Sequence, residues 1–451
     1  MKAKQIFSCK DHSFSVREIF PTLPNPVLPP FVKNEAVTDF LGFGVAITPS
    51  SCYVLSQMEA QERHALLKTI YTSEGANLSI GRLCIGASDY SPEIYSYDDV
   101  SGDVDLAHFS IARDEKYVIP IIKEILSIRP DLFLFASPWS PPAWMKTSET
   151  FSGGYMRECY LECYAEYFVK FIRAYAAHGI KISAVTIQNE PETQQQGLMP
   201  SCIWHPEIEA DFARILRQRF DENRIDTKIW LFDHSFRGTP RVLWQLRNIK
   251  GLTEACAGLA FHYYDGAIEE TAPLAKEYST LPLHFTEAGP RLTDHYTDDY
   301  CKWGIMVARA FKMGYRSFTG WNLMLDELGG PGVGLYSGTC GGLVTRDNRD
   351  GTLSYSGQYV TFCHFAPYVT KNSRLHYLRS ADAFGTCMSG YPLSDSIRTI
   401  EGVEIENGDG RHIAVVINPN TRHMQSHITL GDEEYYLELP AESISTVIVE
   451  K

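Results

Sequence analysis

Two glutamates stand where a carboxylate can do chemistry, each near the end of a short apolar run. Glu190 closes the run ISAVTIQNE (182–190), and Glu287 lies in PLHFTEA (282–288). Pro191 disfavours helix at the residue before it, so Glu190 is expected at a fixed strand-to-loop junction. A single glutamate of this kind could be a solvated helix cap. Two with the same placement favour a shared site, because paired carboxyl groups are the chemistry of glycoside hydrolysis.

Eight short apolar runs that alternate with helical patterns must position these glutamates. The runs are residues 40–47, 78–85, 132–138, 182–190, 227–234, 257–264, 282–288 and 317–323. Their alternation predicts an α/β protein with a (β/α)8 TIM barrel, in which the strand ends meet at one rim. Gly179 is the predicted stop of a helix that begins near residue 158. GFGVAIT (42–48) lacks the third glycine of a dinucleotide-binding fingerprint, which disfavours an open nucleotide-binding sheet.

A smaller domain is expected from the two chain ends. After about residue 370 the pattern changes to alternating strands, and FSVREIF (14–20) is a strand that could join them. The prolines of PTLPNPVLPP (21–30) predict an extended connector between this strand and the barrel. We therefore predict a barrel over residues 39–366 and an antiparallel β-sandwich side domain built from residues 1–38 and 367–451.

Charge and composition limit the partners. With 41 basic and 55 acidic residues the net charge is −14, which disfavours nucleic acid as a partner. We expect no membrane insertion and a cytoplasmic location, because neither a secretory signal nor a long apolar span is evident. The 11 cysteines are scattered without metal-ligand spacing and indicate reduced thiols. The expected partner is a small carbohydrate or glycoconjugate substrate, with no cofactor, and the oligomeric state stays open.

Polar and aromatic residues collect at the predicted rim. They are Arg82, Asp89, Trp139, Asn189, Glu190, Asp233, His234, His262, Tyr264, Glu287, Trp321 and Asn322. Aromatic rings can stack on a sugar, and amides and carboxylates can hold its hydroxyl groups. Glu287 has to be ionised to attack, and Arg82 is the cation expected beside it. Glu190 has to be protonated first, so we expect burial near Trp139 or Tyr264 to raise its pKa.

Two other uses of this rim are open. Metal-assisted hydrolysis would employ Asp233, His234 and His262, but no HxH or HxxE pair occurs at these strand ends, so no metal is predicted. The second alternative is a non-catalytic carbohydrate-binding barrel. Keeping both glutamates, together with Arg82 and Asn189, disfavours it.

Seven motifs resemble glycoside hydrolase family 30, which includes glucosylceramidases, β-glucosidases and β-xylosidases. They are GFGVAIT, GRLCIGASDYS, ASPWSPPAWMKT, AVTIQNEPE, FHYY, HFTEAGP and GWNLMLDELGGP, in this order between about residues 42 and 332. The resemblance implies a retaining mechanism through a covalent glycosyl-enzyme. By motif, Glu190 is similar to the acid/base of this family and Glu287 to its nucleophile.

The resemblance also implies a substrate-binding set. Its members are Arg82, Asp89, Trp139, Asn189, His262, Tyr264, Trp321 and Asn322. For the two tryptophans and His262, burial in the core is the alternative. The expected activity is exo-acting cleavage of a terminal β-linked sugar, as in a glucosylceramidase or β-glucosidase, with β-xylosidase or β-fucosidase as the alternative. The glycine-rich segment 327–342 is expected to form a mobile lip of the site.

Overall fold

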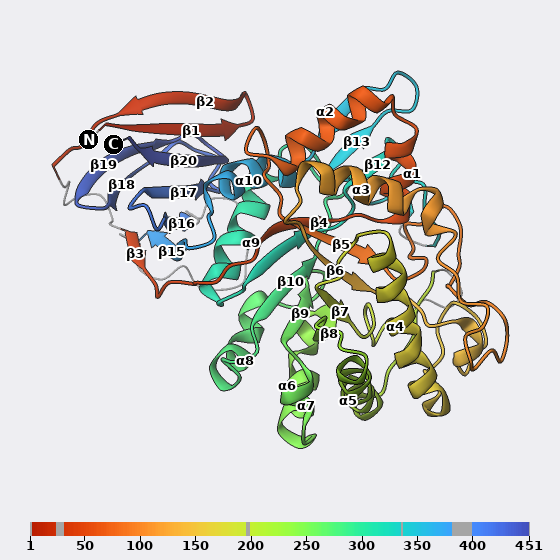
Figure 1. Cartoon of the computed structure of the whole chain (residues 1–451). Coiled ribbons are helices and arrows are strands. Elements are labelled where there is room, and N and C mark those ends of the chain that lie inside the picture. Colours follow the sequence, from red (N-terminus) through yellow and green to blue (C-terminus); the bar gives the residue numbers. More distant parts are fainter. Residues whose placement is uncertain (1, 24–30, 195–198, 335–336, 381–398, 451) are drawn as a thin grey trace.

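The computed structural model describes residues 2–23, 31–194, 199–334, 337–380 and 399–450. Residues 24–30 of the predicted connector and residues 335–336 of the glycine-rich segment lie outside the described residues. Figure 1 shows a barrel surrounded by helices and, beside it, a β domain in which both chain ends lie.

Eight parallel strands close into a barrel, which confirms the predicted fold class. They are β4 (Gly42–Ala46), β5 (Ile80–Cys84), β6 (Phe133–Ser137), β7 (Ala184–Thr186), β8 (Lys228–Ser235), β9 (Gly258–His262), β10 (Leu283–Glu287) and β11 (Ser317–Gly320). Around the barrel the order is β10, β11, β4, β5, β6, β7, β8, β9. Every residue of β5 and β9 is buried, because the barrel interior covers one face and the helices cover the other.

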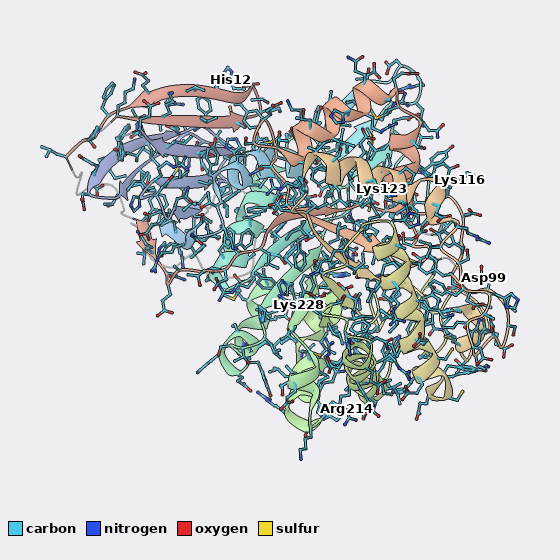
Figure 2. All side chains as sticks on the ribbon, viewed as in Figure 1. His12, Asp99, Lys116, Lys123, Arg214 and Lys228 are labelled. Carbon is cyan, nitrogen blue, oxygen red and sulfur yellow. The ribbon has the colours of Figure 1, made fainter. Side chains whose placement is uncertain are left out.

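Helices form the outer layer of the barrel (Figure 1). They are α1 (Pro49–Ser56), α2 (Ala60–Tyr71), α3 (Val118–Ile128), α4 (Leu161–Ala177), α5 (Pro206–Glu222), α6 (Thr239–Asn248), α7 (Leu252–Ala255), α8 (Ala272–Glu277), α9 (Tyr300–Lys312) and α10 (Gly357–Phe365). On α5, every fourth residue from Phe212 to Phe220 is apolar and buried, with Leu216 between them. Arg214 extends from the opposite face of this helix into solvent (Figure 2).

Helix α4 ends where the sequence predicts. Gly179 has φ +79°, a left-handed conformation that glycine adopts without steric cost. The Ile180 N–H then donates to the Tyr175 carbonyl at 3.0 Å, which closes the helix end and satisfies a carbonyl that has no partner within the helix.

Strands from both ends of the chain form the second domain. Its large sheet has the order β2 (His12–Ile19), β1 (Ala3–Cys9), β20 (Ser443–Val449), β17 (His412–Asn418), β16 (Glu401–Glu406), β15 (Arg374–Ser380), β3 (Phe31–Lys33). β18 (Met424–Leu430) pairs with β19 (Glu433–Leu439). Val416 and Leu437, one from each sheet, lie in a common apolar cluster. The predicted antiparallel β domain is therefore confirmed, and the predicted strand over 14–20 corresponds to β2.

The long segment between β5 and α3 is anchored to the helix layer by one buried carboxylate. Asp114 accepts O–H hydrogen bonds from Tyr95 and Tyr97, both at 2.5 Å, and from Tyr175 of α4 at 2.6 Å. Three donors on one buried acceptor hold the segment against α4. The start of this segment, which carries Asp89, is therefore held on a rigid base.

A small sheet follows the last barrel strand. It consists of β12 (Met324–Asp326), β13 (Val344–Arg346) and β14 (Leu353–Tyr355), and the glycine-rich segment joins β12 to β13. The Val333 N–H donates to the Asp89 carbonyl at 2.6 Å, so this segment lies against the segment after β5. Its mobility stays a prediction. In the part of the chain that the structure describes, no helix has both the length and the apolar character needed to cross a membrane.

Candidate active site

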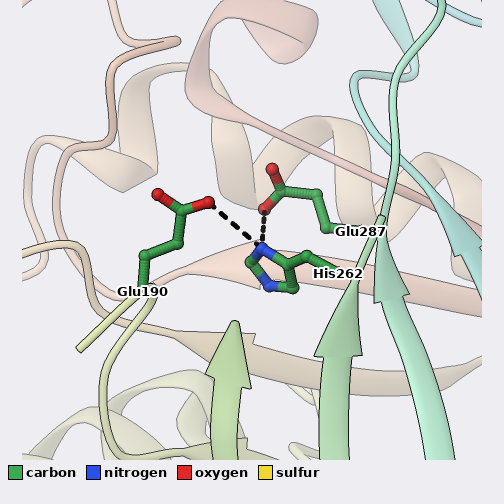
Figure 3. A group of neighbouring side chains, drawn as sticks. All are labelled: Glu190, His262 and Glu287. Carbon is green, nitrogen blue, oxygen red and sulfur yellow. Dashed lines mark hydrogen bonds and ion pairs between the residues drawn. The ribbon is translucent and has the colours of Figure 1, made fainter. Parts of the chain in front are cut away.

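Glu190 and Glu287 lie opposite each other at the carboxyl ends of β7 and β10 (Figure 3). Glu190 has φ +52°, and its N–H donates to the Asp233 carbonyl at 3.0 Å, which holds this uncommon backbone conformation. Glu287 is the last residue of its strand. The carboxylate oxygens of the two residues approach each other within 4.8 Å. Their side chains are 16% and 7% exposed, so a ligand can reach both.

Arg82 supplies the positive charge expected beside Glu287. Its side chain extends from β5, is fully buried, and contacts Glu287 Oε2 through Nη1. Nη2 donates to Asn189 Oδ1 at 2.8 Å and to Asp233 Oδ2 at 2.9 Å. The Arg82 guanidinium therefore orients the side chains of Asn189, Asp233 and Glu287, and it offsets part of the negative charge of the rim.

Asp233 is the residue that sequence reasoning placed at the rim without a role, yet it is the most heavily bonded side chain of the site. Burial alone would raise its pKa, but the Arg82 charge and the neighbouring His262 lower the pKa far below the usual range. Phe232 and Asp233 have φ +83° and +63° at a register shift between β8 and β9, a bulge that turns the carboxylate inward. It accepts hydrogen bonds from Arg82 (2.9 Å), His262 Nε2 (2.9 Å), Ser137 (2.8 Å), Thr186 (2.7 Å) and Thr286 (2.7 Å).

His262 lies between the two glutamates (Figure 3), and its Nε2 contacts Asp233. Because an ionised carboxylate only accepts, Nε2 donates to Asp233 Oδ1. Nδ1 faces Glu190 Oε1 at 3.4 Å and Glu287 Oε2 at 3.8 Å. Burial lowers the pKa of His262, but the charges of Glu287 and Asp233 outweigh this effect and raise the pKa to about 9. The imidazole is therefore positively charged at neutral pH.

The predicted raised pKa of Glu190 is wrong. Burial does act in that direction, but the hydrogen bond with His262 and the nearby charges of His234 and His262 lower the pKa of Glu190 to about 2. Thr193 adds a hydrogen bond to Oε2 at 3.2 Å. The electrostatic partner of Glu190 is thus a cationic imidazole, and this outweighs the dry surroundings that the sequence suggests.

Tyr264 and Asp89 approach the site from two sides. The Tyr264 O–H donates to Glu287 Oε1 at 2.8 Å, so each carboxylate oxygen of Glu287 has a donor. Asp89 is 7% exposed, and its Oδ1 has no hydrogen-bond partner among the described residues. Burial, followed by the charges of Glu287 and Glu190, raises the pKa of Asp89 well above its usual range. A buried acceptor of this kind is costly until a ligand hydroxyl bonds to it.

Trp139 and Trp321 form an aromatic wall. Their rings stack with centroids 5.2 Å apart, and the Arg82 guanidinium lies 4.8 and 5.4 Å from the two centroids. Both tryptophans are buried and both also line the cavity, so burial in the core does not exclude a position beside the substrate. Asn322 is fully buried and accepts a hydrogen bond from Thr48 Oγ1 at 2.9 Å.

The rim encloses a cavity of about 320 Å³. Of the residues expected at the substrate, Asp89, Trp139, Asn189, Glu190, Tyr264, Glu287 and Trp321 line it. Arg82, His262 and Asn322 do not line it. Lining residues that sequence reasoning missed or left without a role are Tyr90, Thr193, Met199, His234, Ser235, Asp265, Gly289, Arg291, Thr339 and Cys340. Most of them lie in loops, where no periodic pattern signals which side chains will converge.

Asp233, His234 and His262, the ligands that the metal-assisted alternative would employ, do not converge on one point. His234 Nε2 pairs with Thr193 at 3.2 Å, and its ring centroid is 6.4 Å from that of His262. Among the described residues, the group with metal-ligand geometry is Glu190, His262 and Glu287. Arg82 and Tyr264 already donate to the Glu287 oxygens, an arrangement that suits a hydrogen-bonded carboxylate.

Comparisons with known proteins match this geometry. The model of the glycosyl hydrolase family 30 TIM-barrel domain matches residues 40–335. An endo-1,6-beta-D-glucanase from Neurospora crassa is 28% identical over 426 residues, covering 89% of this chain and 85% of the relative. Putative glucosylceramidase 3 from Caenorhabditis elegans is 28% identical over 449 residues, covering 93% and 81%. The crystal structure of SrfJ from Salmonella typhimurium superposes with a TM-score of 0.89 at 27% identity over 100% of both chains. The family resemblance is confirmed, and the chain belongs to glycoside hydrolase family 30.

Proposed function

We propose that this glycosidase cleaves β-linked glucosides with retention, using Glu287 as nucleophile and Glu190 as acid/base. The proposal rests on one observation: a carboxylate oxygen of Glu190 and one of Glu287 lie within 4.8 Å of each other. Retaining enzymes hold the two carboxyl groups about 5 to 5.5 Å apart, whereas inverting enzymes need roughly 6.5 to 9.5 Å to admit a water molecule. The short separation supports direct attack by Glu287.

The contacts of each carboxylate support this division of roles. Arg82 and Tyr264 fix both oxygens of Glu287, which favours in-line attack on the anomeric carbon. As the bond between Glu287 and the sugar forms, the bond to the leaving oxygen breaks and Glu190 gives that oxygen a proton. Glu190 then removes a proton from water, which attacks the same carbon and releases Glu287.

The cavity wall supports recognition of one sugar beside the glutamates. Asn189 lines the cavity while its Oδ1 is held by Arg82, which leaves its amide N–H groups for a sugar hydroxyl. Asp89 offers an unpaired acceptor, and Trp139 and Trp321 offer an aromatic wall. The names of the two relatives, a glucanase and a glucosylceramidase, point to glucose as this sugar. β-Xylosidase or β-fucosidase activity is the alternative.

The position of the cleaved bond is the second part of the proposal. The Val333 N–H donates to the Asp89 carbonyl at 2.6 Å, so the glycine-rich segment lies beside Asp89, which favours a terminal glucosyl unit. Similarity to an endo-1,6-beta-D-glucanase over 89% of the chain favours the second candidate, cleavage within a β-1,6-glucan. β-1,6-linked gluco-oligosaccharides labelled at the reducing end separate the two. Terminal cleavage gives glucose together with a labelled product that is one unit shorter, whereas labelled products that are two or more units shorter at the first time points indicate internal cleavage.

Stereochemistry tests the mechanism itself. We expect proton NMR during hydrolysis of an aryl β-glucoside to show β-glucose before the α-anomer. A 2-deoxy-2-fluoro-β-glucoside with an activated leaving group should label Glu287 covalently, because fluorine slows the second step by destabilising its positively charged transition state. First appearance of α-glucose, or a label on a different residue, would refute the proposal. Glu287→Gln should be nearly inert, whereas Glu190→Gln should retain activity on substrates with acidic leaving groups.

A further inference from the structure

We propose that His262, held in place by Asp233, stores the proton that Glu190 gives to the leaving oxygen. Binding of the glycoside sends this proton to Glu190, and the restored charge of Glu287 returns a proton to His262 at the end of the cycle. The inference rests on the proposed function, since it concerns the proton of the acid/base. His262 does not line the cavity, so it acts through Glu190 and does not touch the sugar.

Among the residues that the structure describes, the hydrogen bonds of His262 give this proton only two destinations. Nε2 donates to Asp233 Oδ1 at 2.9 Å, and that carboxylate is kept ionised by its other donors. Nδ1 points at Glu190 Oε1 (3.4 Å) and Glu287 Oε2 (3.8 Å). The imidazole is fully buried, so solvent offers no competing acceptor. Within the part of the chain that the structure describes, a proton on Nδ1 can therefore be shared with these two carboxylates alone.

The charges of this buried group require such a proton. Arg82 pairs with Asp233 and Glu287, whereas Glu190 faces His262, so one arginine stands among three carboxylates. The group would carry a large excess of negative charge unless one more proton were bound. On its remaining sides His262 faces the rings of His234 (6.4 Å between centroids) and Tyr264 (6.1 Å). Neither ring adds a carboxylate to this group. Whether the extra proton is on His262 or on Glu190, the total charge is the same.

Before the glycoside binds, this proton rests on His262, whose Nδ1 faces Glu190 Oε1, in accordance with the pKa of about 9 for His262 and of about 2 for Glu190. A bound glycoside displaces solvent from the Glu190 carboxylate and disfavours its charged form. The proton then moves from His262 Nδ1 to Glu190, which leaves a neutral imidazole. Glu190 protonates the leaving oxygen as Glu287 attacks the anomeric carbon, and Glu287 becomes a neutral ester.

Formation of the ester then lowers the proton affinity of the His262 imidazole. Without the negative charge 3.8 Å from Nδ1, His262 binds a proton less tightly. Glu190 is left as an anion beside a neutral imidazole and is therefore a better base for the attacking water. When that water releases the sugar, Glu287 is ionised again and Glu190 holds the proton taken from water. The restored charge draws this proton back to His262, so the proton lost with the leaving group is replaced.

Nitrogen NMR of the full chain labelled with 15N-histidine tests the inference. We expect His262 to titrate near pH 9 in the free protein, and His262→Gln identifies its signal. In protein trapped with the 2-fluoroglucoside, its pKa should fall by about one to three pH units, the effect of losing a charge at this distance. A free-protein pKa at or below the ordinary value, or no change on trapping, would overturn the inference. Failure to label Glu287 would instead count against the proposed function.

Kinetics of His262→Gln give an independent test. On aryl β-glucosides with weakly acidic leaving groups we expect kcat/KM to fall about 100-fold, whereas on 2,4-dinitrophenyl β-glucoside, which needs no proton, it should stay within about a factor of three. His284→Gln is the matched control, because His284 is buried at the amino end of β10 and bonds Ser317 at 2.9 Å. Its effect should be equal on both substrates. An equal loss on both in His262→Gln would show a merely structural role and contradict the proposal.

Discussion

Arg82 and Asp233 form a fully buried ion pair beneath Glu190 and Glu287, with 2.9 Å between Nη2 and Oδ2. The two residues lie on β5 and β8, which are not neighbours in the barrel. The pair therefore ties strands together across the barrel interior. It also orients the guanidinium toward Glu287 and one carboxylate oxygen toward His262.

Asp233→Asn should destabilise the fold strongly. It removes the carboxylate that accepts hydrogen bonds from Arg82, His262 and Thr286, and breaking a buried pair from one side costs about 3 to 5 kcal/mol. Chemical denaturation of variant and wild type would measure the loss. Asp226→Asn is the matched control, because Asp226 pairs with Lys181 at 2.9 Å with both side chains mostly exposed. That change should cost about 1 kcal/mol or less. Equal effects of the two substitutions would contradict the role given to the buried pair.

Stability should decrease as pH rises from neutrality toward the pKa of His262. The folded pKa is raised from 6.5 to about 9, so the stabilisation is fully present below pH 6.5 and is lost as pH passes through 9. Its size is of the order of 3 kcal/mol, since a tenfold change in proton affinity corresponds to about 1.4 kcal/mol. Thermal unfolding of wild type and His262→Gln across this pH range isolates the effect. If the difference between the two proteins did not change with pH, a charged His262 would be excluded.

Tyr264→Phe should lower the rate without disturbing the fold. The substitution removes the donor 2.8 Å from Glu287 Oε1, and a hydrogen bond to a charged group contributes about 1.5 to 3 kcal/mol. We expect kcat/KM to fall between about 10- and 100-fold, with an unchanged melting temperature. Tyr263→Phe serves as the control, since its ring packs on Phe236 at 6.0 Å between centroids. A comparable loss in both variants would mean that the Tyr264 hydroxyl is not used.

Asp89→Asn should make the empty protein more stable and the enzyme slower. Burial and the charges of Glu287 and Glu190 disfavour the ionised form of Asp89, whose pKa is raised well above the usual range. A neutral amide of the same shape removes that repulsion. It also replaces a carboxyl oxygen that can bond a sugar hydroxyl by an amide nitrogen, so kcat/KM should fall about 10-fold or more. Calorimetry combined with kinetics on one aryl glucoside checks both directions. Reduced stability together with unchanged kinetics would show that Asp89 serves the fold alone.

Much of this architecture is contained in local sequence patterns. Eight apolar runs identify the barrel strands because a strand buried on both faces has to be apolar along its length. Glu190 and Glu287 stand out because a carboxylate at the end of such a run lies at the rim of any parallel barrel. The sequence predicts the burial of single side chains less closely. Asn322, for example, is expected at the sugar but does not line the cavity.

The sequence by itself determined the fold class and the two carboxylates that face each other across the cavity, because both follow from periodicity and strand ends. Only the tertiary structure decided the charge state of the site. Glu190 and His262 are 72 residues apart in the chain, yet 3.4 Å separates their polar atoms, and the inward turn of Asp233 depends on a bulge that leaves no compositional trace. Electrostatic energy varies with distance and burial, and neither quantity exists before the strands close into a barrel.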